Sequence, residues 1–140
     1  MITDLIIDVN TITFILPESM QIDIRPETAL TPTHRRADEQ PALTYLAGIG
    51  KSSQRVQWSA LCVASAVLTS NNCTPITLPW WELRRQHLNA LRAWLVEHRA
   101  PATANRIMAA VRGTLKEAWR LDQMTTEQYM KAIDVKPIRG

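Results

Sequence analysis

The chain has 140 residues, of which 46% are hydrophobic and 21% are charged, with four glycines and eight prolines. This balance is typical of one globular domain and excludes collagen-like, low-complexity and wholly disordered chains. No stretch approaches the ~18 consecutive apolar residues of a membrane span, and the first residues do not form the basic start of a signal peptide. We therefore expect a soluble, cytoplasmic protein with no membrane partner.

Charge is divided unevenly along the chain. Residues 1–50 carry seven acidic and three basic side chains, whereas residues 51–140 carry thirteen basic and six acidic side chains. The two parts therefore differ in net charge, −4 against +7. Clustered positive charge attracts a polyanion over several ångströms, so the second part is expected to meet nucleic acid or another anionic surface. The acidic part is not expected to grip DNA, and is interpreted as a shield for the basic face or a contact for a partner.

The first forty residues are predicted to differ in structure from the rest. Residues 5–16 are rich in β-branched side chains and partly alternate, which indicates one strand or a hairpin. Residues 27–40 are polar without a period, and we interpret them as a mobile linker. The sequence thus predicts an N-terminal extension over residues 1–40 and a domain over residues 41–140.

That domain is predicted to be all-α, with short connections that suit antiparallel neighbours. The expected helices cover residues 41–50, 53–69, 79–99, 101–121 and 126–133. The second helix is expected to have a serine hydroxyl as its N-cap, Val56 on its apolar face and Cys62 on the opposite side. Trp80 and Trp81, at the start of the third helix, are expected to wedge between helices.

The helix predicted over residues 101–121 has two distinct faces when its residues are placed at 100° intervals. One face is apolar. The other, which we call the basic stripe, consists of Asn105, Ala109, Arg112, Lys116 and Arg120. Ala109 and Gly113 are expected to keep the middle of this face low. A helix fits the DNA major groove, where Arg and Lys neutralise phosphates and Arg or Asn can read base edges; the alternative is an ordinary solvated face.

Catalytic and metal chemistry find little support in the sequence. The three histidines are too far apart to suggest a metal pair, and nucleotide-binding and nucleophile-elbow motifs are absent. Cys62 and Cys73 have no CxxC spacing, so we interpret them as reduced thiols. We therefore expect no catalytic residues, no metal ligands, no cofactor and no small-molecule substrate.

Several segments together resemble the N-terminal core-binding domain of tyrosine recombinases, the phage integrase family. They are the run from Pro41 to Leu46, Ser53-Gln54-Arg55, Trp81-Glu82-Leu83, the run from Leu88 to Arg92 and, above all, Thr103 to Leu121. The last of these resembles the helix that such integrases carry just before their catalytic domain. The resemblance covers about residues 41–140 and lies in the order and spacing of these segments.

The resemblance implies a SAM-like orthogonal bundle of four to five helices that clamps duplex DNA at a crossover site, with the second and fourth helices at the major groove. It also implies cooperating recombinase protomers on the DNA, for which the short first and last helices carry apolar residues. The catalytic domain of the family is expected to be absent, because no His is followed three positions later by Arg. Tyr45 and Tyr129 are therefore not expected to act as the nucleophile.

Our functional prediction is a DNA-binding core-binding domain of a prokaryotic, nucleoid-associated recombinase or integrase. The alternatives are a stand-alone small DNA-binding regulator and a helical protein-interaction domain. The residues predicted to contact DNA are Lys51, Gln54, Arg55, Ser59, Thr103, Asn105, Arg106, Ala109, Arg112, Lys116 and Arg120.

Overall fold

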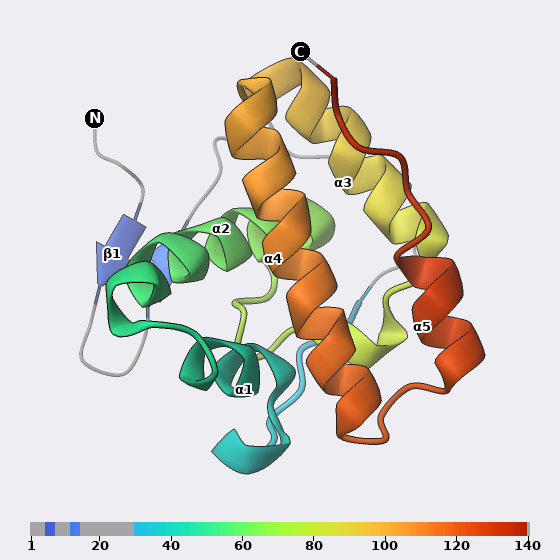
Figure 1. Cartoon of the computed structure of the whole chain (residues 1–140). Coiled ribbons are helices and arrows are strands. Elements are labelled where there is room, and N and C mark those ends of the chain that lie inside the picture. Colours follow the sequence, from blue (N-terminus) through green and yellow to red (C-terminus); the bar gives the residue numbers. More distant parts are fainter. Residues whose placement is uncertain (1–4, 8–11, 15–29, 140) are drawn as a thin grey trace.

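The computed structural model describes the backbone of residues 5–7 and 12–14 and the whole of residues 30–139 (Figure 1). Within these residues lie five α-helices: α1 (Pro41–Ala47), α2 (Lys51–Thr69), α3 (Arg85–His98), α4 (Pro101–Arg120) and α5 (Thr126–Ala132). Two short 3-10 helices, η3 (Ala37–Glu39) and η4 (Trp80–Glu82), precede α1 and α3. The predicted all-α bundle is confirmed, and four of its five helices end within two residues of the expected position.

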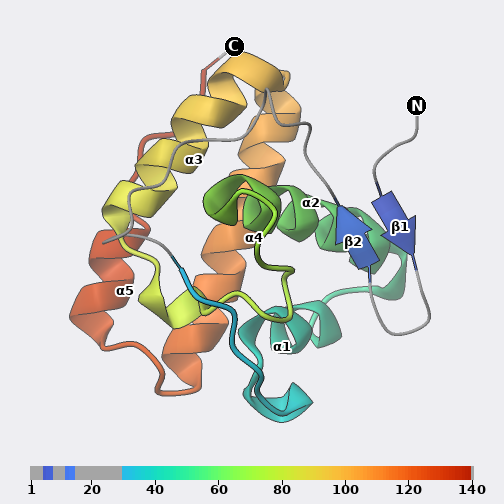
Figure 2. The ribbon, with the colours of Figure 1, turned by 180° about the vertical axis from the view of Figure 1, so that it is seen from behind.

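In the segment predicted to be one strand or a hairpin, the described residues form two paired strands. Strands β1 (Leu5–Ile7) and β2 (Ile12–Phe14) pair antiparallel, with Leu5 opposite Phe14 and Ile7 opposite Ile12. Figure 2 shows β2 beside the N-terminal half of α2. The other residues of the predicted 5–16 segment lie outside the described ones.

Helix α2 is the centre of the bundle, and α1, α3 and α4 all pack against it. Trp58 and every residue from Ala60 to Thr69 are buried. Two predictions for this helix are wrong, because Cys62 is only 2% exposed while Val56 is 45% exposed. The second half of α2 is covered on every side and has no polar face, so the two-faced pattern of a surface helix does not apply to Cys62. Val56 lies in the N-terminal half of the helix, where several residues are exposed.

The starts of two helices differ from prediction. The N-cap of α2 is Gly50, with no side-chain hydrogen bond, rather than a serine. The third helix does not begin at Pro79, because the chain first makes η4, where Trp80 is fully buried and its Nε1 donates to the Pro75 carbonyl at 2.9 Å. The buried indole holds this part of the chain against the core, and α3 begins only at Arg85.

The described part of the predicted linker, residues 30–40, is anchored to the domain at both ends, while residues 34–38 between them are exposed. Leu30 is a core residue, and the Thr33 amide donates to the Thr77 carbonyl at 2.8 Å. Gln40 is 1% exposed: its Oε1 accepts the Ala42 amide at 2.7 Å, and its Nε2 donates to the Ile76 carbonyl at 2.7 Å. Leu30, Thr33 and Gln40 are therefore fixed on the domain, which contradicts the prediction of a mobile linker at these residues.

A close approach between α1 and α4 depends on Gly113. The aromatic ring of Tyr45 lies over this glycine, so that a Cβ at position 113 would overlap Tyr45 Cε1 and come within 2.9 Å of Cδ1. The Tyr45 hydroxyl lies 3.3 Å from Gln57 Oε1 on α2. The low point that we predicted at Gly113 is therefore filled by a ring of the same molecule and is not open to a ligand.

We expect the Gly113→Ala substitution to destabilise the fold by about 1–3 kcal/mol, because the added methyl group must displace a packed ring. Urea unfolding measures the change. Gly48→Ala is the matched control, since its Cβ would meet only ordinary contacts at 3.6 Å, and it should be nearly neutral. Equal losses from the two substitutions would contradict a specific role for the Tyr45 ring.

Candidate nucleic-acid interface

The solvent-facing surface of α4 is basic and smooth. Apart from Pro101 in the first turn, its exposed residues lie along one side of the helix at spacings of four, three, seven and four residues: Ala102, Arg106, Ala109, Lys116 and Arg120. None of them is acidic. The neighbouring Glu117 has a side chain only 17% exposed, and it pairs with Arg120 at 2.9 Å. The helix of 20 residues is about 30 Å long, and these five residues, which we call the α4 face, lie along it on both sides of Gly113, where the Tyr45 ring packs.

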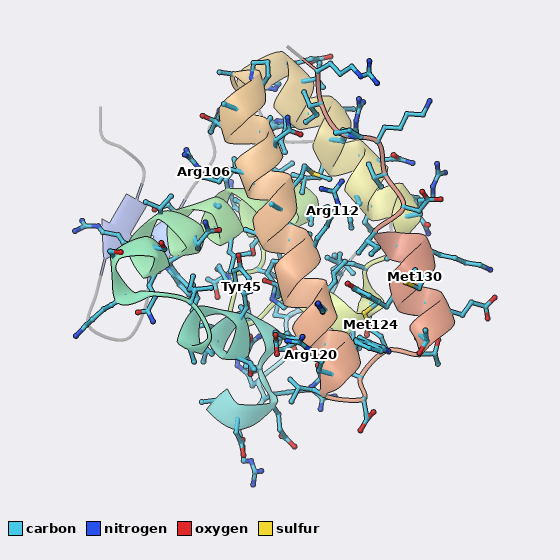
Figure 3. The ribbon with its side chains drawn as sticks, viewed as in Figure 1. Tyr45, Arg106, Arg112, Arg120, Met124 and Met130 are labelled. Atoms are coloured by element: carbon cyan, nitrogen blue, oxygen red, sulfur yellow. The ribbon has the colours of Figure 1, made fainter. Side chains whose placement is uncertain are left out.

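The α4 face shares Ala109, Lys116 and Arg120 with the predicted basic stripe, but the other two members of that stripe are occupied within the molecule. Asn105 Nδ2 donates to the Ile138 carbonyl at 2.6 Å, and its Oδ1 accepts the Ile138 amide at 2.9 Å. Arg112 Nη2 donates to the Val135 carbonyl at 3.0 Å. Figure 3 shows Arg106 on the α2 side of α4 and Arg112 on the opposite side, toward the C-terminal residues.

These contacts are part of a larger set that holds residues 134–139, the C-terminal segment, against α3 and α4. Arg85 donates to the Asp134 carbonyl at 2.9 Å, and Arg92 donates to the carbonyls of Lys136 and Pro137 at 2.8 and 3.1 Å. Val135 and Ile138 are buried. Asn105 and Arg112 therefore have a structural role that accounts for their presence on α4 without DNA.

The N-terminal half of α2 contributes further basic side chains. Lys51 and Arg55 are exposed, as the predicted site requires. Gln54 is committed elsewhere, since its Nε2 donates to the Leu46 carbonyl at 2.9 Å and so fixes the corner between α1 and α2. Among the α2 residues predicted to contact DNA, Lys51 and Arg55 are therefore the cations exposed to a polyanion.

A groove with a volume of about 220 Å³ runs between α2 and the start of α4. It brings together the predicted Ser59, Thr103 and Arg106 over an apolar floor that includes Ile107. Arg99 also lines it and was missed by the sequence analysis. Its guanidinium lies 5.0 Å from the centre of the Trp94 ring, at the C-terminal end of α3. Cations are common at the C-terminal ends of helices, so the sequence around Arg99 does not single it out. Its place in the groove depends on the tertiary fold.

Residues 30–139 hold no group of three or more His, Cys, Asp or Glu side chains able to bind a metal ion. Tyr129 stacks on Trp119 with ring centres 5.4 Å apart, and burial raises the pKa of Tyr45. Both cysteines are free and buried, and burial raises the pKa of Cys62 from 9.0 to about 12. Such thiols are poor nucleophiles at neutral pH.

The apolar residues of the first and last helices, which we expect to contact other protomers, are mostly half-buried. Tyr45, Leu46, Ile49, Tyr129 and Ile133 are all intermediate in exposure, whereas Met130 on α5 is 56% exposed. Self-association through these short helices stays a prediction.

No helix in the described part of the chain is both long and apolar enough to span a membrane. Comparison with known proteins found no matching family model, curated protein or solved structure. The interface is therefore interpreted from its own residues.

We expect Asn105→Ala to loosen the C-terminal segment, because the substitution leaves the Ile138 amide and carbonyl without their partner. The loss should be about 1–2 kcal/mol in urea unfolding, and the Ile138 amide should exchange with solvent faster. Asn89→Ala is the control, since Asn89 is exposed on α3. Unchanged exchange at Ile138 would show that the two hydrogen bonds do not hold the segment.

The raised pKa of Cys62 predicts a loss of stability at alkaline pH. The thiol ionises near pH 9 in the unfolded chain but only near pH 12 in the folded one, so unfolding becomes more favourable as pH rises from about 9 toward 12. Urea unfolding at pH 8 and pH 10 should show a steeper decline for the parent than for Cys62→Ala. The same decline in both would rule out a contribution from this thiol.

Proposed function

We propose that this chain binds double-stranded DNA through the α4 face, with the exposed cations of α2 beside it. The observation that carries the proposal is the composition of that face: Arg106, Lys116 and Arg120 are exposed along one helix with no unpaired carboxylate among them. Lys51 and Arg55 extend the positive charge onto α2. Clustered cations of this kind supply the phosphate contacts that dominate affinity for DNA.

The shape of the face supports a helix in the major groove. Ala102 and Ala109 are exposed between the cations, so the backbone of α4 can approach base edges closely at these points. The groove floored by Ile107 lies at one edge of the helix, with Arg99 and Arg106 on its walls. A major groove is about 12 Å wide and admits a single helix. Phosphates on the strand beside α2 would then meet Lys51, Arg55 and Arg106.

We further propose that the chain serves as the core-binding module of a site-specific tyrosine recombinase. The order of its helices and the resemblance of residues 103–121 to the corresponding integrase helix support this. A stand-alone DNA-binding regulator would use the same α4 face. The coding sequence that follows Gly140 separates the two, because a recombinase requires a domain with the catalytic Arg, His and Tyr residues.

Salt dependence tests the proposed interface. If the five exposed cations on α2 and α4 each neutralise one phosphate, log K should fall with log salt concentration at a slope of about −4 to −5, since each contact contributes about −0.9. Fluorescence anisotropy with a labelled duplex, at several salt concentrations, gives this slope. Arg106→Gln and Lys116→Gln should each flatten it by about 0.9.

Lys131→Gln is the matched control, because Lys131 is an equally exposed cation that pairs with Glu127 on α5 at 3.0 Å. It should leave both affinity and slope nearly unchanged. Far-UV circular dichroism checks that each variant is folded. A slope near zero for the parent, or equal effects from all three substitutions, would contradict the proposal and favour a protein-interaction domain.

A further inference from the structure

A second cleft lies between α3 and the C-terminal segment. It has a volume of about 610 Å³ and is lined by Arg92, Val96, Lys136, Pro137, Ile138 and Arg139. This volume is within the range of small-molecule binding sites. We call it the α3 cleft. None of the residues predicted to contact DNA lines it.

The polar groups that line the α3 cleft are all cationic. Arg92, Lys136 and Arg139 supply three positive charges, and no carboxylate is among the lining residues. None of the three forms an ion pair with a residue of the described part of the chain. Like charges that converge without a counter-charge repel one another, so an anion that enters the cleft gains attraction and also relieves this repulsion.

The Arg92 side chain and the backbone that carries the other two cations are held in place. Arg92 donates from Nε to the Lys136 carbonyl and from Nη2 to the Pro137 carbonyl, which fixes its guanidinium plane and leaves other N–H groups free. Anchoring of Val135 and Ile138 fixes the backbone that carries the other two cations. The site is thus pre-organised, which lowers the entropic cost of binding.

The spacing along the C-terminal segment explains why both of its cations line the cleft. Val135 and Ile138 are buried, while Lys136 and Arg139, also three residues apart, both line the cleft. A period of three is that of a polyproline-type extended chain, and Pro137 favours this conformation. One face of the segment therefore packs on the domain while the next carries positive charge into the cleft.

We propose that the α3 cleft is a binding site for a phosphate group. Arg forms bidentate hydrogen bonds with phosphate, and Lys adds a compact charge, so the trio suits a doubly charged oxyanion better than a single carboxylate. Two sources share this chemistry: a free polyphosphate compound and a backbone phosphate of bound DNA. The proposal does not require DNA to bind at the α4 face.

Inorganic pyrophosphate is the first probe, followed by two-dimensional ¹⁵N NMR of the whole chain at constant ionic strength. We expect saturable shifts of the Arg92 Nε–H and of the amides of residues 136–139, with a dissociation constant on the order of 1 mM or lower. The double variant Lys136→Gln and Arg139→Gln should weaken binding by at least about tenfold. Both side chains are exposed, so the fold should be unaffected.

The control is a double variant that removes the same two charges elsewhere, Arg36→Gln with Lys131→Gln. Both residues pair with neighbouring carboxylates and neither lines the cleft, so pyrophosphate binding should remain at the parent level. If pyrophosphate produces only unsaturable shifts spread over many basic residues, or if the control variant loses as much affinity as the test variant, the proposal is overturned.

A duplex of about 20 base pairs then distinguishes the two sources. If the duplex shifts the same signals and displaces pyrophosphate, the bound group is a DNA phosphate. If pyrophosphate binds equally well in the presence of the duplex, or the duplex does not bind at all, the site serves a free polyphosphate. Failure of DNA binding therefore refutes the proposed function alone, whereas failure of pyrophosphate to bind at the cleft refutes this proposal.

Discussion

The complete burial of the second half of α2 is the constraint on which the rest of the structure depends. Ten consecutive residues, from Ala60 to Thr69, are buried, so other parts of the chain must pack against this half of the helix on every side. Each turn of a fully buried helix removes apolar surface from water in all directions, at roughly 25 cal/mol per Å². Helices α1, α3 and α4 pack against α2, and β2 lies beside its N-terminal half. The position of α4, and with it the direction of its basic surface, follows from this arrangement.

The elements that could be predicted from the sequence are those whose signals are local. Proline at the start of α4, a clear apolar face and a capping box at Thr125 fix the bounds of α4 and α5 almost to the residue. The burial of Cys62 and the exposure of Val56 could not be read in the same way, because they depend on which helices surround α2. Likewise, no local pattern shows that residues 30–40 are anchored to the domain, since Gln40 is polar yet forms its hydrogen bonds with a loop 35 residues away.

The same distinction applies to the candidate interface. Counting at 100° per residue correctly finds a polar side of α4 that carries Lys116 and Arg120, and it identifies Arg106 nearby. It does not show that Asn105 and Arg112 hold residues 134–139. A side chain that donates to a backbone carbonyl and one that donates to a phosphate look the same in a sequence. Arg99 illustrates the opposite case, in which a residue with no distinguishing local feature is brought to the groove by the tight turn between α3 and α4.

The contacts that hold the C-terminal segment have a consequence for how its sequence can vary. Arg85, Arg92, Asn105 and Arg112 all bond to main-chain atoms, which every amino acid supplies, and only Val135 and Ile138 place side chains in the core. The fold therefore constrains two of the six positions in this segment by size and polarity. At the others, mutation can change the charge of the molecular surface without altering the path of the chain, so the electrostatic character of this edge can evolve independently of the domain's stability.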